Sequence, residues 1–177
     1  MTIYFNDTTI GRIGIAEEEG SITNLYFETD TFPQNIEIRE TEVIREAFRQ
    51  LAAYLAGDLK SFSLPLTPRG TDFMQKVWKI LCQVPFGKTA SYREVAIAAG
   101  NPGGARAVGM ANNRNPVPIF IPCHRIIGAD GKLTGYRGGL DLKLKLLELE
   151  GYEGQTRRSV RQTSICTSNS TMSNALF

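Results

Sequence analysis

The spacing of apolar residues changes once along this chain, and that change restricts the possible folds more than any other feature. Residues 2–29 contain three strand-length pieces, TIYFND, GRIGIAEE and SITNLYFET, which are broken by Gly20 and by polar turn residues. Apolar residues then recur at helical spacing in TEVIREAFRQLAAYLAGD, which Thr41 is suited to cap and Gly57 to end. After SFSLPLTPRG the pattern is mostly helical. The sequence therefore predicts an α/β (α+β) fold in which a small sheet-plus-helix domain precedes a helical one.

The prolines of SFSLPLTPRG mark the predicted boundary between these two domains. We place an N-terminal supporting domain at residues 1–64 and the mostly helical domain at residues 65–152. Residues 153–177 are rich in Ser, Thr and Asn and have no sustained apolar period, so we predict a mobile polar tail there. A chain of 177 residues with 42% hydrophobic residues is long enough for two small domains with packed cores.

Composition argues against several classes of protein. The formal net charge is only +2, so any binding of nucleic acid has to come from a local arrangement of charge. No apolar run approaches the roughly 18 residues of a membrane-spanning helix, and the N-terminus lacks the layout of a signal peptide. We therefore expect no membrane partner and a cytoplasmic location, or a nuclear one in a eukaryotic host. Three widely spaced cysteines and a single histidine favour neither a disulfide framework nor a structural zinc site, and we expect no metal.

Two short helical segments separated by NPGG form a helix-turn-helix outline. The first, SYREVAIAAG, carries a capping box of Ser91 and Glu94 and stops at Gly100. The second, ARAVGMANN, is made mostly of small residues, with Arg106 as the long side chain of its first turns. A narrow helix surface with one arginine to insert suits the minor groove of DNA, which is about 6 Å wide. Tight helix–helix packing is an alternative reason for the small residues.

The segment PIFIPCHRII sets the single histidine of the chain beside a cysteine in nearly apolar surroundings. A thiol with a pKa of about 8.5 is mostly protonated at neutral pH, so a nucleophilic Cys123 needs a base such as His124. Neighbouring side chains of an extended segment point to opposite faces, so the imidazole has to act at a turn or through a water molecule. By spacing, Glu150 or Glu148 is suited to orient the imidazole. A buried cysteine beside a satisfied core histidine is the alternative interpretation.

Several motifs of the helical half occur together in one known family. RGTDFMQKVW, SYREVA, GNPGGARAVG, NRNPVPIFIPCHRIIGADGKLTGYRGG and LLELEG follow one another in unbroken register from Arg69 to Gly151. In this stretch the sequence resembles the O6-alkylguanine-DNA alkyltransferases, also called methylated-DNA–protein-cysteine methyltransferases. The N-terminal half resembles the family only in its layout, which implies a ribonuclease-H-like domain.

The resemblance implies a DNA repair protein. The alkyl group of O6-alkylguanine, and of O4-alkylthymine, in double-stranded DNA would pass irreversibly to Cys123, once per molecule, after the base has flipped out through the minor groove. This is the activity of a methylated-DNA–[protein]-cysteine S-methyltransferase that needs no cofactor, and we expect a monomer. A non-enzymatic DNA-binding relative is disfavoured because such relatives lack the acceptor cysteine. A cysteine hydrolase is disfavoured because its oxyanion donors are not evident.

The resemblance also assigns roles at the reaction site. It makes Cys123 the alkyl acceptor, His124 the base that activates the thiol through a water molecule, and Glu150 the group that orients the imidazole. Asn115 matches the asparagine that braces the helix against the active-site segment. Tyr136 matches the tyrosine that hydrogen-bonds the flipped guanine.

Four further positions match DNA-binding residues of the family, namely Tyr92, Arg93, Asn101 and Arg106, of which Arg106 matches the intercalating arginine. The chain also departs from the family in two ways. Arg137 stands where some members carry a small or hydroxylated residue, which bears on the width of the alkyl pocket. The N-terminal half lacks the cysteine and histidine ligands with which some members bind zinc.

Overall fold

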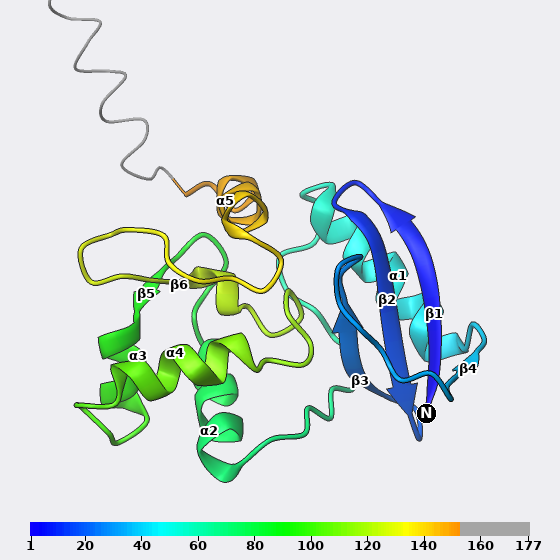
Figure 1. The fold of residues 1–177 in the computed structure, drawn as a ribbon. Helices are drawn as coiled ribbons and strands as arrows, with labels where there is room; N and C mark the ends of the chain where they lie inside the picture. The colour runs from blue at the N-terminus through cyan, green and yellow to red at the C-terminus, as the bar shows by residue number, and fades with distance from the viewer. Residues whose placement is uncertain (153–177) are drawn as a thin grey trace, which may run out of the picture.

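The structure is a computed structural model that describes residues 1–152, and the predicted tail at residues 153–177 lies outside the described residues. Figure 1 shows a β-sheet with one helix on one side of the molecule and a group of helices on the other. The predicted class, with a sheet domain first and a helical domain second, is confirmed. The division between residues 64 and 65 stays a prediction.

The N-terminal sheet has four strands in the spatial order β3-β2-β1-β4. They are β1 (Thr2–Thr8), β2 (Gly11–Glu18), β3 (Ser21–Tyr26) and β4 (Glu37–Ile38). The first three pair antiparallel through tight turns, as alternating apolar residues and the intervening Gly20 predict. β4, which the sequence pattern did not predict, adds a two-residue parallel pair to the edge of β1.

Helix α1 (Glu42–Leu55) packs on one face of this sheet (Figure 1). The Thr41 side chain accepts a hydrogen bond from the backbone of Ile44, and Gly57 takes a φ of +87° just after the last turn. Both predicted ends of the helix are therefore confirmed, because an N-cap hydroxyl satisfies a free N–H and glycine tolerates the left-handed region.

The second domain consists of short helices with one small parallel pair of strands. Its elements are α2 (Asp72–Leu81), β5 (Ala90–Ser91), α3 (Tyr92–Ala98), α4 (Ala105–Asn113), β6 (Ile126–Ile127) and α5 (Leu140–Leu149). The indole N–H of Trp78 in α2 donates to the backbone oxygen of Ala111 in α4 at 2.9 Å, which ties these helices together. Within residues 1–152 no helix is long and apolar enough to cross a bilayer.

Helices α3 and α4 form the predicted helix-turn-helix. Both halves of the capping box are present, because the Ser91 side chain accepts from the Glu94 backbone and the Glu94 carboxylate accepts from the Ser91 backbone. Gly100 ends α3 with a φ of +76°. The predicted capping residues therefore set both ends of α3, whereas α4 begins after Gly104 without a side-chain cap.

The segment that carries the cysteine and histidine is a single 3₁₀ turn, Cys123–Arg125, which is the turn that the sequence analysis left open as an alternative to an extended segment. The backbone N–H of Arg125 donates to the Pro122 carbonyl oxygen at 3.1 Å, which closes the turn. Pro122 has no N–H of its own to donate to a strand ladder, which disfavours continued extension at this point. A turn brings Cys123 and His124 closer to one side of the backbone than a strand does.

The two domains share backbone hydrogen bonds and a continuous core. Leu25 in β3 donates to the Pro116 carbonyl oxygen at 2.8 Å, just after α4. Ile22 donates to Pro65 in the connecting segment, also at 2.8 Å. One cluster of buried apolar side chains runs from the sheet face through α1 to α2, α4 and α5. The sheet domain is therefore packed directly against the segment that carries the cysteine.

Candidate active site

Cys123 is held by the side chain of Asn115 and is only 5% exposed. The Asn115 amide nitrogen donates to the Cys123 sulfur at 3.3 Å and to the Ile121 carbonyl oxygen at 2.9 Å. Its amide oxygen accepts from the Val117 backbone at 3.1 Å. Asn115 therefore contacts both the turn after α4 and the cysteine itself, so the structure brings these two predicted site residues together.

His124 is fully buried, and its ring is fixed by Glu150. The imidazole Nε2 lies 2.9 Å from the Glu150 Oε1. Burial alone would raise the pKa of Glu150, but hydrogen bonds from His124 and Arg125 outweigh that effect and lower it to about 2. The carboxylate is therefore ionised at neutral pH, and Nε2 carries the proton that it donates. Glu148, the other sequence candidate, is exposed.

The second ring nitrogen of His124, Nδ1, has no hydrogen-bond partner among the described residues. Burial lowers the pKa of His124 despite the opposing effect of Glu150, so the ring is neutral at neutral pH. With the proton on Nε2, the lone pair of Nδ1 is free to accept a proton. The arrangement has the chemistry of a general base with a fixed tautomer.

The Glu150 carboxylate also accepts hydrogen bonds from three other residues. Arg125 donates from both Nε and Nη2 at 2.9 Å, and the Gly87 backbone donates at 3.1 Å. The hydroxyl of Tyr54, in α1, donates at 2.6 Å and lies 3.3 Å from the His124 Nε2. The expectation that the N-terminal half is only a supporting domain is therefore incomplete, because it contributes a polar group to the site.

The Cys123 thiol is electrostatically unactivated in this state. Burial raises its pKa, while the hydrogen bond from Asn115 and the positive charges of Lys143 and Arg137 act in the opposite direction without cancelling that effect. A buried thiol with a raised pKa is protonated at neutral pH and is a weak nucleophile. The sulfur therefore needs a proton acceptor at the moment of reaction.

Lys143, in α5, is a buried positive charge beside the site. It is 0% exposed, and its ammonium group donates to the backbone oxygens of Ile126 at 2.6 Å and Thr134 at 2.8 Å. Burial lowers the pKa of Lys143 to about 8. Lys143 therefore joins β6 to the loop at Thr134 and adds positive potential where a thiolate would form.

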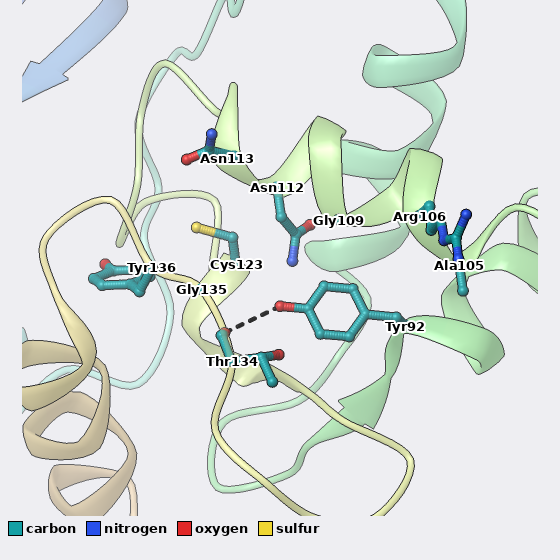
Figure 2. A pocket seen from close by; sticks show the side chains of 10 residues that line it. All are labelled: Tyr92, Ala105, Arg106, Gly109, Asn112, Asn113, Cys123, Thr134, Gly135 and Tyr136. Carbon is teal, nitrogen blue, oxygen red and sulfur yellow. Dashed lines mark hydrogen bonds between the residues drawn. The ribbon is translucent and has the colours of Figure 1, made fainter.

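A pocket of about 390 Å³ opens beside Cys123, as Figure 2 shows. Helices α3 and α4 supply one wall and residues 134–136 supply the other. This volume falls within the range of about 300–1,000 Å³ that is typical of small-molecule sites. The lining residues are Tyr92, Ala105, Arg106, Gly109, Asn112, Asn113, Cys123, Thr134, Gly135 and Tyr136.

The structure divides the four predicted DNA-binding residues into two groups. Tyr92 and Arg106 line the pocket, and the Tyr92 hydroxyl donates to the Thr134 backbone oxygen at 3.2 Å across it (Figure 2). Arg93 and Asn101 are exposed on α3 and on the following turn, away from the pocket lining. Arg106 is also exposed, at the edge of the pocket.

Two family models match the two parts of the chain. One is described as the ribonuclease-like domain of 6-O-methylguanine DNA methyltransferase and matches residues 1–68. The other is described as the DNA binding domain of 6-O-methylguanine DNA methyltransferase and matches residues 72–152. The chain belongs to the 6-O-methylguanine DNA methyltransferase family.

Relatives within the 6-O-methylguanine DNA methyltransferase family are similar over most of their length. The methylated-DNA–protein-cysteine methyltransferase of Methanosarcina barkeri is 50% identical to this chain, over 81% of this chain and 93% of that protein. The constitutive methylated-DNA–protein-cysteine methyltransferase of Bacillus subtilis is 46% identical, over 81% of this chain and 92% of that protein. The crystal structure of Mycobacterium tuberculosis OGT in complex with DNA has a TM-score of 0.80 and 46% identity, over 85% of this chain and 92% of that one. Membership gives the predicted enzyme class, methylated-DNA–[protein]-cysteine S-methyltransferase.

In this 6-O-methylguanine DNA methyltransferase family member, Arg137 lies outside the residues that line the pocket. Its guanidinium donates to the backbone oxygens of Asn115, at 3.1 Å, and of Leu25. It also pairs with Asp30 at 3.2 Å and lies over the Phe27 ring. Arg137 therefore ties its own loop to the sheet domain and does not narrow the pocket.

Sequence reasoning missed Tyr54 and Lys143. Tyr54 occupies a position of α1 that fits the apolar stripe, so its hydroxyl carried no separate signal. Lys143 did carry one, because it lies three, four and seven residues before Leu146, Leu147 and Glu150, which places it on the buried face of α5. A lysine inside an apolar helical stripe is a usable sign of a buried charge.

Proposed function

We propose that this chain repairs O6-alkylguanine in double-stranded DNA by transferring the alkyl group irreversibly to its own Cys123, once per molecule. The observation that carries the proposal is that the Cys123 thiol lines a pocket while the neighbouring His124 has a fixed tautomer and an Nδ1 with no partner among residues 1–152. Membership of the family supports the same reaction, and the M. tuberculosis relative that is in complex with DNA supports DNA as the partner.

The first step activates the thiol. The Cys123 proton passes to Nδ1 of His124 through one water molecule, and the imidazolium that forms is stabilised by the Glu150 carboxylate. The amide of Asn115 and the ammonium of Lys143 stabilise the negative sulfur. Asn115 and Lys143 are too weak to ionise the thiol before reaction, but they stabilise the thiolate once His124 has taken the proton.

The second step transfers the alkyl group. The sulfur attacks the alkyl carbon, the S–C bond forms, and the C–O6 bond breaks with its electron pair remaining on the guanine. The guanine anion takes up one proton, which the imidazolium can return, so atoms and charges balance without a cofactor. The product thioether is not hydrolysed at neutral pH, which makes the reaction a single turnover.

A guanine inside a duplex cannot reach Cys123, so the base has to leave the stack. Unstacking costs a few kcal/mol. Arg106, exposed at the pocket edge on the small-residue helix α4, is in a position to fill the gap in the stack from the minor groove. Arg93 and Asn101 supply further contacts to the DNA backbone. O4-alkylthymine is the second proposed substrate, and action as a monomer in the cytoplasm remains part of the proposal.

Intact-mass spectrometry after mixing the protein with an O6-methylguanine duplex tests the reaction, stoichiometry and residue together. We expect a gain of one methyl group per chain, on Cys123 and not on Cys82 or Cys166. Cys123→Ala should remove the gain while the protein still binds DNA, because the sulfur is not a phosphate contact. Cys82→Ala is the matched control and should react normally, since Cys82 lies outside this pocket.

Two results would contradict the proposed function. Continued release of guanine with excess substrate would indicate a catalyst that turns over, such as a hydrolase. Binding of the modified duplex with no change in protein mass would indicate a protein that recognises the lesion without repairing it.

A further inference from the structure

Asn112, near the C-terminal end of α4, presents its side-chain amide to the pocket. Its side chain lines the pocket together with Cys123, and the residue is only 8% exposed. Neither its amide nitrogen nor its amide oxygen has a hydrogen-bond partner among residues 1–152. Because both atoms lack one, exchanging them by rotating the amide would not change this observation. Figure 2 shows the amide pointing from α4 into the space between Cys123 and Tyr92.

A buried amide without a protein partner costs free energy that an apolar side chain would not. The nearby Asn115 is the comparison, because its nitrogen and its oxygen are both engaged within the protein. Packing of α4 therefore does not account for an amide at position 112. An amide that faces a pocket is instead suited to hydrogen-bond a molecule that enters the pocket.

We propose that Asn112 is a specificity-determining residue that hydrogen-bonds the extruded base, an inference that rests on the proposed function. A carboxamide offers an acceptor beside a donor. O6-alkylguanine offers the complementary pair at N1, which has lost its proton and accepts, and at the 2-amino group, which donates. N1 adjoins the carbon that bears the alkylated oxygen, so a group that contacts N1 lies close to the sulfur that attacks the alkyl group. Asn112 and Cys123 line the same pocket, as this contact requires.

The same pairing distinguishes the lesion from the repaired base. Once the alkyl group has left, guanine carries a proton on N1, so both N1 and the 2-amino group are donors. The carboxamide then keeps only its acceptor contact, and its donor is left unpaired. Asn112 therefore favours the alkylated base over both normal guanine and the reaction product.

The pairing also ranks the two proposed substrates. O4-alkylthymine presents two acceptors, N3 and O2, along the corresponding edge and no donor. The Asn112 oxygen is then left without a partner, and a site built for a two-point contact discriminates against an analogue that lacks one of the two groups. We expect Asn112 to contribute to a preference for alkylguanine over alkylthymine.

Single-turnover transfer rates for three substrates test this assignment. The substrates are duplexes that contain O6-methylguanine, O6-methylhypoxanthine, which lacks the 2-amino group, and O4-methylthymine. Asn112→Leu removes the amide at similar volume and should slow repair of O6-methylguanine about 10-fold, which corresponds to about 1.4 kcal/mol. It should slow the other two duplexes by about 3-fold or less, because they already lack one of the two contacts.

Three controls keep the result interpretable. Asn6→Leu makes the same change at an exposed position of β1 and should alter none of the rates. Asn112→Ala should reproduce the substrate pattern if the leucine disturbs packing, and thermal unfolding of each variant reports on folding. Equal slowing of all three substrates by both Asn112 variants, or no slowing, would overturn the assignment. Failure of the wild-type protein to methylate Cys123 would instead overturn the proposed function.

Discussion

The residue that most affects the proposed chemistry is Glu150, although it does not touch the sulfur. Its carboxylate accepts from Nε2 of His124 and so leaves the lone pair on Nδ1. It also offsets part of the cost of forming a buried imidazolium. The pKa shifts of the two partners are consistent with this picture, because the carboxylate stays ionised while burial keeps the imidazole neutral.

The rate of alkyl transfer should therefore depend on pH with a low midpoint. Protonated His124 cannot accept the thiol proton, so the rate falls as the pH drops through the histidine pKa. Burial places that pKa below its ordinary value of about 6.5. We expect a midpoint on the acid side of this value when transfer to free O6-benzylguanine is measured from about pH 5 to about pH 8. A midpoint at or above the ordinary value would contradict the assignment.

A pair of glutamate variants identifies the group that orients the imidazole. Glu150→Gln should slow transfer about 10-fold or more and shift the acid midpoint to lower pH, because the anion that favours the imidazolium is gone. Glu148→Gln changes an exposed carboxylate two residues away and should do neither. Glu150→Gln leaves the buried Arg125 without its partner charge, which can destabilise the fold. Circular dichroism and thermal unfolding therefore check that this variant is folded.

At the scale of elements, the helix-turn-helix joins the DNA surface to the reaction pocket. Helix α4 carries Arg106 near its start and Asn112 near its end, and both line the pocket beside Cys123. Glycine and alanine occupy much of the rest of the helix, which keeps its surface narrow. One short helix thus supplies the proposed wedge for the stack and one wall of the base pocket.

The proposed wedge predicts that the effect of Arg106 depends on the substrate. Arg106→Ala should slow repair of duplex DNA about 10-fold or more and leave transfer to free O6-benzylguanine unchanged, because a free base needs no extrusion. A mismatched lesion, which costs less to unstack, should recover part of the loss.

Arg93→Ala is the matched control on the neighbouring helix. If Arg93 is a phosphate contact, this variant should weaken DNA binding evenly across sequences. It should also reduce the slope of the logarithm of the binding constant against the logarithm of the salt concentration by about 1. Equal losses on duplex and free base for Arg106→Ala would mean that Arg106 supports the fold and does not act as a wedge.

At the scale of the whole molecule, the sheet domain fixes the pocket loop through Arg137. The guanidinium joins Asp30 and the backbone of Leu25 on one side to the backbone of Asn115 on the other. Its side chain is 27% exposed and that of Asp30 is 17% exposed, so the pair is only partly screened by solvent. Such an ion pair matters more than one at the surface, because loss of one charge leaves the other poorly solvated.

Asp30→Asn should lower the free energy of unfolding by about 1–2 kcal/mol. Asparagine still accepts the hydrogen bond that the Phe27 backbone gives to Asp30, so the change isolates the charge. Glu37→Gln removes one partner of the exposed pair with Arg39 and should change stability by less than about 1 kcal/mol. Urea unfolding of both variants provides the comparison, and equal effects would contradict a special role for the Arg137 pair.

The sequence predicted the local features of this fold well. The capping box at Ser91, the N-cap at Thr41 and the glycine that ends α3 depend on residues a few positions apart, and so they are visible in the sequence. Asn115 was singled out only by the family resemblance, and its contact with the Cys123 sulfur was not predicted.

Other features of the site depend on contacts that no local pattern contains. The Tyr54 hydroxyl meets Glu150 across 96 positions of the chain, and Arg137 meets Leu25 across 112. The Asn112 amide, which has no partner within the described part of the chain, is recognisable as such only once the burial of its neighbourhood is known. Tertiary packing sets these contacts, so periodicity and spacing could not predict them.

The hydrogen bonds to Glu150 join residues from the beginning and the end of the described chain. The site around Cys123 is therefore complete only late in translation. Tyr54 comes from the first helix of the chain, whereas Glu150 directly follows α5, the last helix among the described residues. During translation, the imidazole therefore acquires its orienting carboxylate only after nearly all of the described part has left the ribosome and α5 has docked. In the proposed single-turnover reaction, a thiol lost to a stray electrophile cannot be recovered. Because burial raises the pKa of Cys123 in the folded protein, the late step that supplies the orienting carboxylate is also the step that completes the shielding of the thiol.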